Sequence, residues 1–130
     1  MCFDGGSPFL ILGPMQLTEL SRRALEIRSR YAAVESAHGG QPWSRAELAQ
    51  GFAGDVGELM KLVMAKDGRR AAPADLDSKL AHELADCLWS VLVLADACDV
   101  DLERAFGQTM NELETKLAAP VVRQKVSPNG

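Results

Sequence analysis

Four carboxylates stand in two pairs whose spacing suits one face of a helix. Asp55 and Glu58 are three residues apart, and so are Glu83 and Asp86 further along the chain. Side chains at this spacing lie on neighbouring turns of the same helix face. If two adjacent helices carry the pairs, Asp55 and Glu58 can face Glu83 and Asp86 across the gap between the helices.

Carboxylates gathered in this way need a cation. Two unit charges about 5 Å apart repel each other by about 3 kcal/mol at an effective dielectric constant of about 20. Ligand sets made only of oxygen select Mg²⁺, or Mn²⁺, over zinc, and they usually leave positions for water and a substrate phosphate. The predicted chemistry is therefore metal-assisted hydrolysis of a phosphate ester or anhydride. Either pair by itself is better explained as a solvated acidic face, so the metal interpretation depends on the two pairs occurring together.

The elements that must position these acids are helices. Apolar residues recur at helical spacing in four segments, and the period of two that is typical of strands is absent from the sequence. We expect an all-α protein, built as a four-helix antiparallel bundle. The expected helices comprise about residues 17–31 or a little beyond, 45–65, 76–97 and 102–117. The short link between the second and third helices predicts an antiparallel hairpin, which would bring the two acidic pairs together.

The start of the second helix has a clear sequence signal. Ser44 followed by Glu47 is a capping box, and Trp43 with Leu48 can form the hydrophobic staple around it. Trp43 is also a candidate for stacking on a nucleobase, so the staple and the base contact are both kept as explanations. Aspartates are the capping candidates for the later helices: Asp75 or Asp77 for the third, and Asp101 for the fourth.

Three glycines recur within the second helix, at positions 51, 54 and 57. Each costs roughly 1 kcal/mol against alanine in a helix interior. We expect the close approach of another helix or of a ligand to compensate for this cost.

Composition narrows the class of protein. The 130 residues suit one domain, which we divide into a loose leader at 1–15, a helical domain at 16–118 and a flexible tail at 119–130. The net charge of −4 and the scattered basic residues indicate no nucleic-acid partner. The apolar segments are too short to predict a membrane span. Three cysteines without metal-binding spacing indicate a reduced, cytoplasmic setting.

Longer stretches around the acidic pairs carry a family resemblance. The sequences Gly-Asp-Val-Gly-Glu-Leu at 54–59 and His-Glu-Leu-Ala-Asp-Cys-Leu at 82–88, followed by residues 94–106, resemble the MazG-like nucleotide pyrophosphohydrolases. That family carries Glu-x-x-Glu on one helix and Glu-x-x-Asp on the next. The likeness covers about residues 43–117, and it is closest to the small dCTP pyrophosphatase-like members.

The resemblance implies both an assembly and a reaction. It implies a helical homodimer or homotetramer of the house-cleaning type, which cleaves a (deoxy)nucleoside triphosphate to monophosphate and pyrophosphate. By motif match, Asp55, Glu58, Glu83 and Asp86 would ligate Mg²⁺, and Asp55 or Glu58 would also orient the attacking water. Asp55 stands where the family normally carries glutamate.

The contacts with the substrate are less well defined by the resemblance. Lys61, three residues after Glu58, could reach a phosphate or pair with Glu58. The family's last helix carries a lysine, an asparagine and an Arg-Tyr pair, and the aligned positions here are Thr109, Leu113, Lys116 and Leu117. We expect Lys116, together with Asn111 two residues before the asparagine position, to contact substrate.

Two alternatives to this enzyme remain open. One is a non-catalytic helical dimer that retains a degenerate metal or nucleotide site. The other is a related hydrolase that acts on a phosphoribosyl nucleotide.

Overall fold

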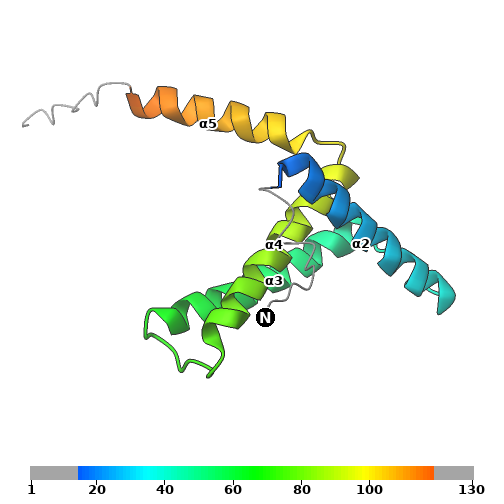
Figure 1. Ribbon diagram of the computed structural model, residues 1–130, viewed down its shortest axis with the longest axis horizontal. Coiled ribbons are helices and arrows are strands. Elements are labelled where there is room, and N and C mark those ends of the chain that lie inside the picture. Colours follow the sequence, from blue (N-terminus) through cyan, green and yellow to red (C-terminus); the bar gives the residue numbers. More distant parts are fainter. Residues whose placement is uncertain (1–14, 119–130) are drawn as a thin grey trace, which may run out of the picture. The chain divides into compact units, whose positions relative to one another are not determined.

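The computed structural model describes residues 15–118, and this part of the chain contains four helices and no strand. The helices are α2 (Leu17–Ala37), α3 (Arg45–Lys66), α4 (Leu76–Ala97) and α5 (Leu102–Ala118) (Figure 1). The all-α prediction is thus confirmed. Apart from Met15, the predicted leader at 1–15 and tail at 119–130 lie outside the described residues.

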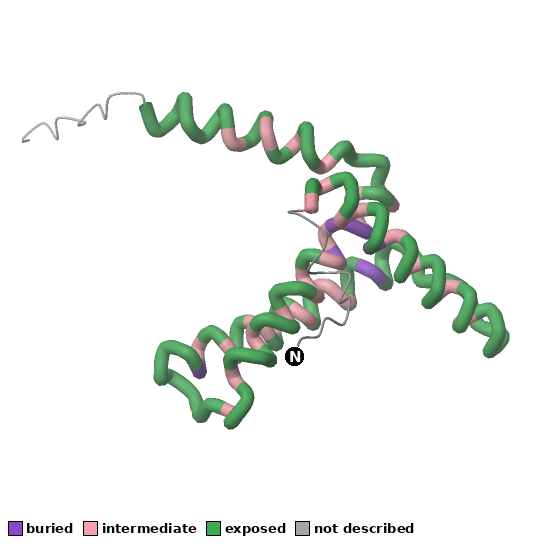
Figure 2. Tube along the Cα trace, in the orientation of Figure 1, coloured by how far each residue is buried: buried purple, intermediate pink, exposed green. Residues whose placement is uncertain are grey.

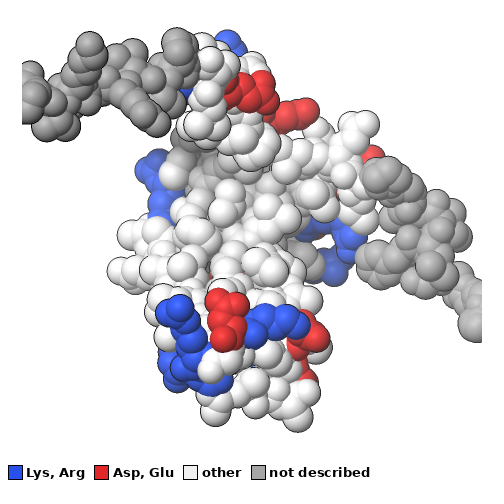
Figure 3. Space-filling view, turned by 90° about the vertical axis from the view of Figure 1, so that its left-hand side faces the viewer, with Lys and Arg blue, Asp and Glu red and all other residues white. Residues whose placement is uncertain are grey.

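Helices α3 and α4 lie side by side as the predicted hairpin (Figure 1). Charged side chains gather at its connecting end, whereas the middle of the face shown in Figure 3 carries few of them. Asp75 occupies the N-cap position of α4, but its side chain makes no capping hydrogen bond and lies 3.5 Å from Lys79 Nζ. Asp77 pairs instead with Lys66 across the connection, at 2.6 Å. The aspartates at this helix start therefore form ion pairs rather than a side-chain cap.

The start of α3 follows the predicted capping box. Ser44 Oγ accepts a hydrogen bond from the Glu47 amide at 3.2 Å, and Glu47 Oε1 accepts one from the Ser44 amide at 3.3 Å. Leu48 is buried, while Trp43 remains 49% exposed. A Cβ atom placed on Gly51 would lie 3.1 Å from Trp43 Cζ3. Gly51 therefore makes room for the indole ring.

The other two glycines of α3 are not explained in this way. A Cβ atom added at Gly54 or at Gly57 would meet no atom within 4 Å in the described part of the chain. The predicted close approach of another helix is therefore not seen at these two positions, and the approach of a ligand there stays a prediction.

Helix α2 is longer than the sequence pattern indicated. It runs to Ala37, because Ala32, Ala33 and the residues after them continue the helix beyond Tyr31. It ends where the His38 amide bonds back to Val34 and Glu35 and where Gly39 adopts a positive φ of 80°. The additional turns carry Glu35, which lines the cavity described below.

The small core lies where α2 crosses the α3–α4 hairpin (Figure 2). Its buried residues come from all three helices, and they are Ala24, Leu48, Ser90, Leu92 and Val93. Ala65 is buried at the other end of the hairpin. Within residues 15–118, no helix is long and apolar enough to cross a membrane.

The chain divides into two compact units, and α5 belongs to the second, which begins at Asp101. Asp101 Oδ1 accepts a hydrogen bond from the Arg104 amide at 3.1 Å, so the predicted cap of this helix is confirmed. Apolar residues recur along α5 at helical spacing: Leu102, Phe106, Met110, Leu113 and Leu117.

Candidate metal and nucleotide site

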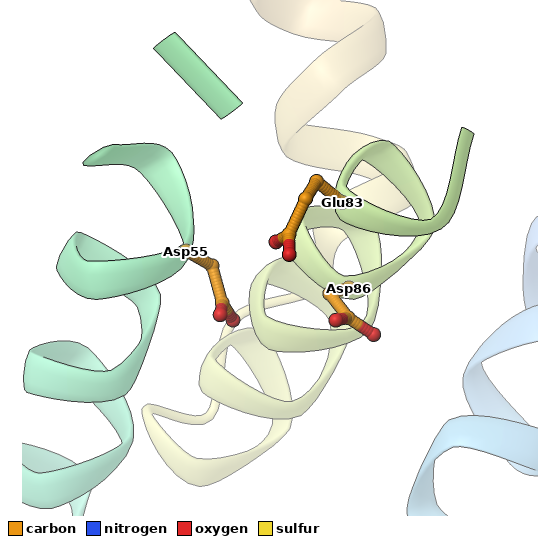
Figure 4. Close-up of side chains that lie close together, drawn as sticks. All are labelled: Asp55, Glu83 and Asp86. Atoms are coloured by element: carbon orange, nitrogen blue, oxygen red, sulfur yellow. The ribbon is translucent and has the colours of Figure 1, made fainter. Parts of the chain in front are cut away.

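Three of the four predicted acids converge between α3 and α4. Asp55 extends from α3 toward α4, and Glu83 points back toward it (Figure 4). One carboxylate oxygen each from Asp55, Glu83 and Asp86 lies within 4.8 Å of the others. The hairpin therefore brings these three carboxylates together as the spacing predicted, with Glu83 and Asp86 on successive turns of one helix.

The environment of Glu83 fits a cation. Its Oε2 atom is buried and has no hydrogen-bond partner among the described residues. A buried, unpaired carboxylate oxygen is costly, and an ion is one of the few groups that can satisfy it. The donors are all carboxylate oxygens, which suits Mg²⁺ or Mn²⁺.

The same negative field acts on a neighbouring thiol. Burial raises the pKa of Cys87, and the nearby carboxylates of Asp55, Glu83 and Asp86 raise it further, because each disfavours a thiolate. Cys87 is a free cysteine, as is the exposed Cys98.

Asp86 has a partner that sequence reasoning missed. His82 Nε2 lies 3.1 Å from Asp86 Oδ2, one helical turn away. Their spacing of four residues was the available signal. An imidazole in this position can orient the carboxylate of a metal ligand.

Glu58, the fourth predicted acid, lies outside the converging group. Its Oε1 atom accepts a hydrogen bond from Lys61 Nζ at 2.9 Å, so the ion-pair alternative for Lys61 is the one observed. Glu58 lines a second, smaller hollow together with Glu83 and Lys79. It is therefore adjacent to the acidic group without contributing an oxygen to it.

A larger cavity of about 690 Å³ adjoins the acidic group. Asp55, His82 and Asp86 form part of its wall. Most of the remaining lining is apolar or aromatic, and it includes Ile27, Tyr31, Trp43, Leu48 and Trp89. A largely apolar cavity with a few convergent polar groups is the usual form of a small-molecule site.

Trp89 holds one wall of this cavity in place. Its Nε1 donates a hydrogen bond to the backbone oxygen of Ala24 at 3.2 Å. Its ring packs edge-on against Tyr31, with centroids 6.1 Å apart and planes at 74°. Trp89 therefore joins α4 to α2 at the edge of the cavity.

Comparison with known proteins settles the family. The model of the MazG nucleotide pyrophosphohydrolase domain matches residues 44–118 of this chain. The chain belongs to the MazG family. The suspected resemblance is thus confirmed, and the family supports nucleotide pyrophosphohydrolase activity in general. No curated protein and no solved structure shows significant similarity to the chain.

The MazG match contains the acidic group and helices α3 to α5. It begins after Trp43, and it leaves out the whole of α2. Yet α2 contributes Arg28, Tyr31 and Glu35 to the cavity wall. Sequence reasoning missed these three residues, because nothing in the first helix indicated which of its faces would line a cavity.

The last two predicted substrate contacts lie on α5. Asn111 and Lys116 are both exposed, and their unit is described separately from the one that holds the acidic group. The backbone oxygen of Asn111 accepts a hydrogen bond from Thr115 Oγ1 at 3.0 Å. Their contact with substrate stays a prediction.

Proposed function

We propose that this MazG-family protein is a Mg²⁺-dependent nucleoside triphosphate pyrophosphohydrolase. Water would attack the α-phosphorus of a (deoxy)nucleoside triphosphate, and the bond to the oxygen bridging the α and β phosphates would break. The products are a nucleoside monophosphate and pyrophosphate. The observation that carries the proposal is the convergence of Asp55, Glu83 and Asp86 beside an aromatic cavity, with a buried oxygen of Glu83 left unpartnered.

Asp55, Glu83 and Asp86 are the residues that would hold Mg²⁺, or Mn²⁺ in its place. When bound, such an ion neutralises charge on the phosphate and lowers the pKa of a coordinated water. His82 would keep the Asp86 carboxylate oriented through its contact at 3.1 Å.

Glu58 is the residue that we propose to orient the attacking water and accept its proton. It lies one turn from Asp55 and shares a hollow with Glu83. It is more than half exposed, and its only partner among the described residues is Lys61. Exposed ion pairs of this kind contribute little to stability, so Glu58 can leave Lys61 at low cost. Lys61 would then be available to a phosphate oxygen, which is the other of the two roles that the sequence left open.

The base would lie in the cavity against Trp43. Gly51 leaves room for one part of the indole, and about half of the Trp43 surface remains open. Aromatic rings at a cavity wall favour stacking of a planar ligand. Asn111 and Lys116 remain our candidates for contacts with the triphosphate.

The test is pyrophosphate release from a panel of nucleoside triphosphates, with Mg²⁺ and without it. Glu83→Gln and Asp86→Asn should each lower kcat/KM roughly 100-fold or more, because each removes charge stabilisation at the reacting phosphate. Asp96→Asn is the matched control, since Asp96 is an exposed acid on the same helix outside the acidic group. Metal and nucleotide binding without turnover of any nucleotide would instead favour a non-catalytic sensor. Turnover of phosphoribosyl nucleotides alone would favour the related hydrolase.

We also propose that the protein is a homodimer or homotetramer. Helix α3 exposes Val56, Met60 and Val63 at helical spacing, and α4 exposes Leu84 and Leu88. Apolar faces of this kind are usually covered by another chain. Met60→Glu should reduce the assembly seen by sedimentation, whereas Gln50→Glu, an exposed substitution on the same helix, should leave it unchanged.

A further inference from the structure

One acid in the cavity has no role in the reaction proposed above. Glu35, near the end of α2, lines the same cavity as Trp43 and Asp55, but it is not part of the acidic group. It is half-buried, and its carboxylate has no hydrogen bond or ion pair with any residue of the described part of the chain. A half-buried carboxylate without a donor is available to a ligand that supplies one.

The turn after α2 makes room for the Glu35 carboxylate. The Gly40 amide donates a hydrogen bond to the backbone oxygen of Glu35 at 2.8 Å. A Cβ atom placed on Gly40 would lie only 3.1 Å from Glu35 Oε2. A side chain at position 40 would therefore require the carboxylate to shift by a few tenths of an ångström.

The cavity around Glu35 suits a flat ligand with polar edges. Tyr31, one turn before Glu35 on α2, and Trp43 supply aromatic surface to the same cavity. Arg28 lies seven residues before Glu35 on the cavity-lining face of α2, about 10 Å away along the helix axis. It too forms no ion pair among residues 15–118. Along its lining face, α2 thus presents the cation of Arg28, the aromatic ring of Tyr31 and the anion of Glu35, in that order. This order suits a nucleotide whose phosphates lie toward Arg28 and whose base lies toward Glu35.

An ionised carboxylate can only accept hydrogen bonds, and its two oxygens bind best to two adjacent N–H donors. Among the common nucleobases, guanine alone offers such a pair, at N1–H and the exocyclic N2 amino group. Adenine and cytosine each place an acceptor beside their amino group. Uracil and thymine flank their single N3–H with two carbonyl oxygens, which repel a carboxylate.

We propose that Glu35 is the residue that selects the base and that it selects guanine. This inference rests on the proposed function for the reaction that follows binding. The base preference itself can also be measured from nucleotide binding alone. The substrate class is then a guanine (deoxy)nucleoside triphosphate, or one whose modified base keeps the same two donors. The base lies against Trp43 with its Watson–Crick edge on the Glu35 carboxylate, and Arg28 is left to the phosphates.

Glu35→Gln gives the decisive experiment, because an amide offers one acceptor and one donor in the place of two acceptors. We would measure binding of GMP, AMP, CMP and UMP from quenching of tryptophan fluorescence, together with kcat/KM for the four triphosphates. The unmodified protein should prefer guanine by roughly tenfold or more. Glu35→Gln should lose that preference and gain affinity for adenine or cytosine, whose edges pair one donor with one acceptor.

Two further variants separate recognition from folding. Gly40→Ala keeps the charge but shifts the carboxylate by a few tenths of an ångström, so it should weaken GMP binding modestly while UMP binding changes little. Glu19→Gln removes an exposed acid from the same helix and should leave base preference intact. Circular dichroism of each variant checks that the helices remain.

The outcomes distinguish this inference from the proposed function. Metal-dependent release of pyrophosphate from all four triphosphates at similar rates would overturn guanine selection and leave the enzyme in place. Selective GMP binding that Glu35→Gln redirects to another base, without turnover of any triphosphate, would support guanine selection and overturn the enzyme. An unchanged base preference in Glu35→Gln would overturn the role of Glu35.

Discussion

Trp89 Nε1 lies 3.2 Å from the backbone oxygen of Ala24, and this hydrogen bond joins α4 to α2 where the two helices cross. Trp89 also packs edge-on against Tyr31. Three turns along α2, Glu35 depends on this crossing for its place at the cavity, because α2 itself contributes little to the buried core beyond Ala24. The crossing therefore links the stability of the fold to the shape of the cavity.

We first predict that Trp89→Phe destabilises the protein by about 1 kcal/mol, the usual net value of one hydrogen bond. The aromatic contact with Tyr31 is retained in this variant, so the loss reports mainly the missing N–H donor. Urea unfolding followed by circular dichroism measures the change. Trp43→Phe is the control, since the Trp43 indole makes no hydrogen bond within the described residues and should cost less. Equal losses from the two variants would contradict the structural role of the Trp89–Ala24 bond.

Local sequence signals predicted the start of α3 and the start of α5. The capping box at Ser44 and the cap at Asp101 are both present, because each depends only on residues within one turn. Asp75 and Asp77 were predicted as alternative caps of α4, but both pair with lysines instead. Asp75 pairs with Lys79, one turn along α4, and Asp77 pairs with Lys66 across the connection. The Asp77–Lys66 pair depends on how the loop closes, which helix-start signals do not encode, whereas the spacing of four residues between Asp75 and Lys79 was an available signal.

The candidate site, too, was predicted only in part from the sequence. Helical spacing predicted that Asp55, Glu83 and Asp86 could converge, and their carboxylate oxygens do approach one another. The same spacing placed Glu58 on the face of Asp55, yet its long side chain turns to Lys61. The α2 side of the cavity was not predictable, because the crossing angle of α2 follows from packing around Trp89 and Ala24 rather than from periodicity.

Our second prediction concerns stability with and without Mg²⁺. Three carboxylate oxygens within 4.8 Å repel one another, by up to about 3 kcal/mol per pair before solvent screening. Glu83→Gln should therefore raise the free energy of unfolding in EDTA by about 1 kcal/mol. The unmodified protein should gain stability when Mg²⁺ is added, and the variant should gain much less.

Chemical unfolding at several Mg²⁺ concentrations tests this second prediction, and Asp96→Asn serves as the control. A stabilisation of Glu83→Gln by Mg²⁺ equal to that of the unmodified protein would show that Glu83 does not hold the ion.

The third prediction is that Ser44→Ala lowers stability by about 1 kcal/mol, the usual cost of losing an N-cap side chain. The variant leaves the Glu47 amide without its acceptor at the start of α3. Ser44→Asp keeps an acceptor at the same place and should retain most of the stability. Thermal unfolding of the three proteins checks this order, and a fully stable Ser44→Ala would mean that the cap contributes nothing measurable.

The fourth prediction uses Cys87 as a reporter of the acidic group. Burial and the carboxylates of Asp55, Glu83 and Asp86 raise the pKa of Cys87, so less of its reactive thiolate is present at any given pH. Alkylation followed by peptide mass spectrometry should show Cys87 reacting several-fold more slowly than the exposed Cys98. In Glu83→Gln one of the three negative neighbours is gone, so the pH at which Cys87 begins to react should fall. Since burial still acts in that variant, the fall should be partial, and an unchanged or rising onset would contradict the electrostatic coupling between Cys87 and the acidic group.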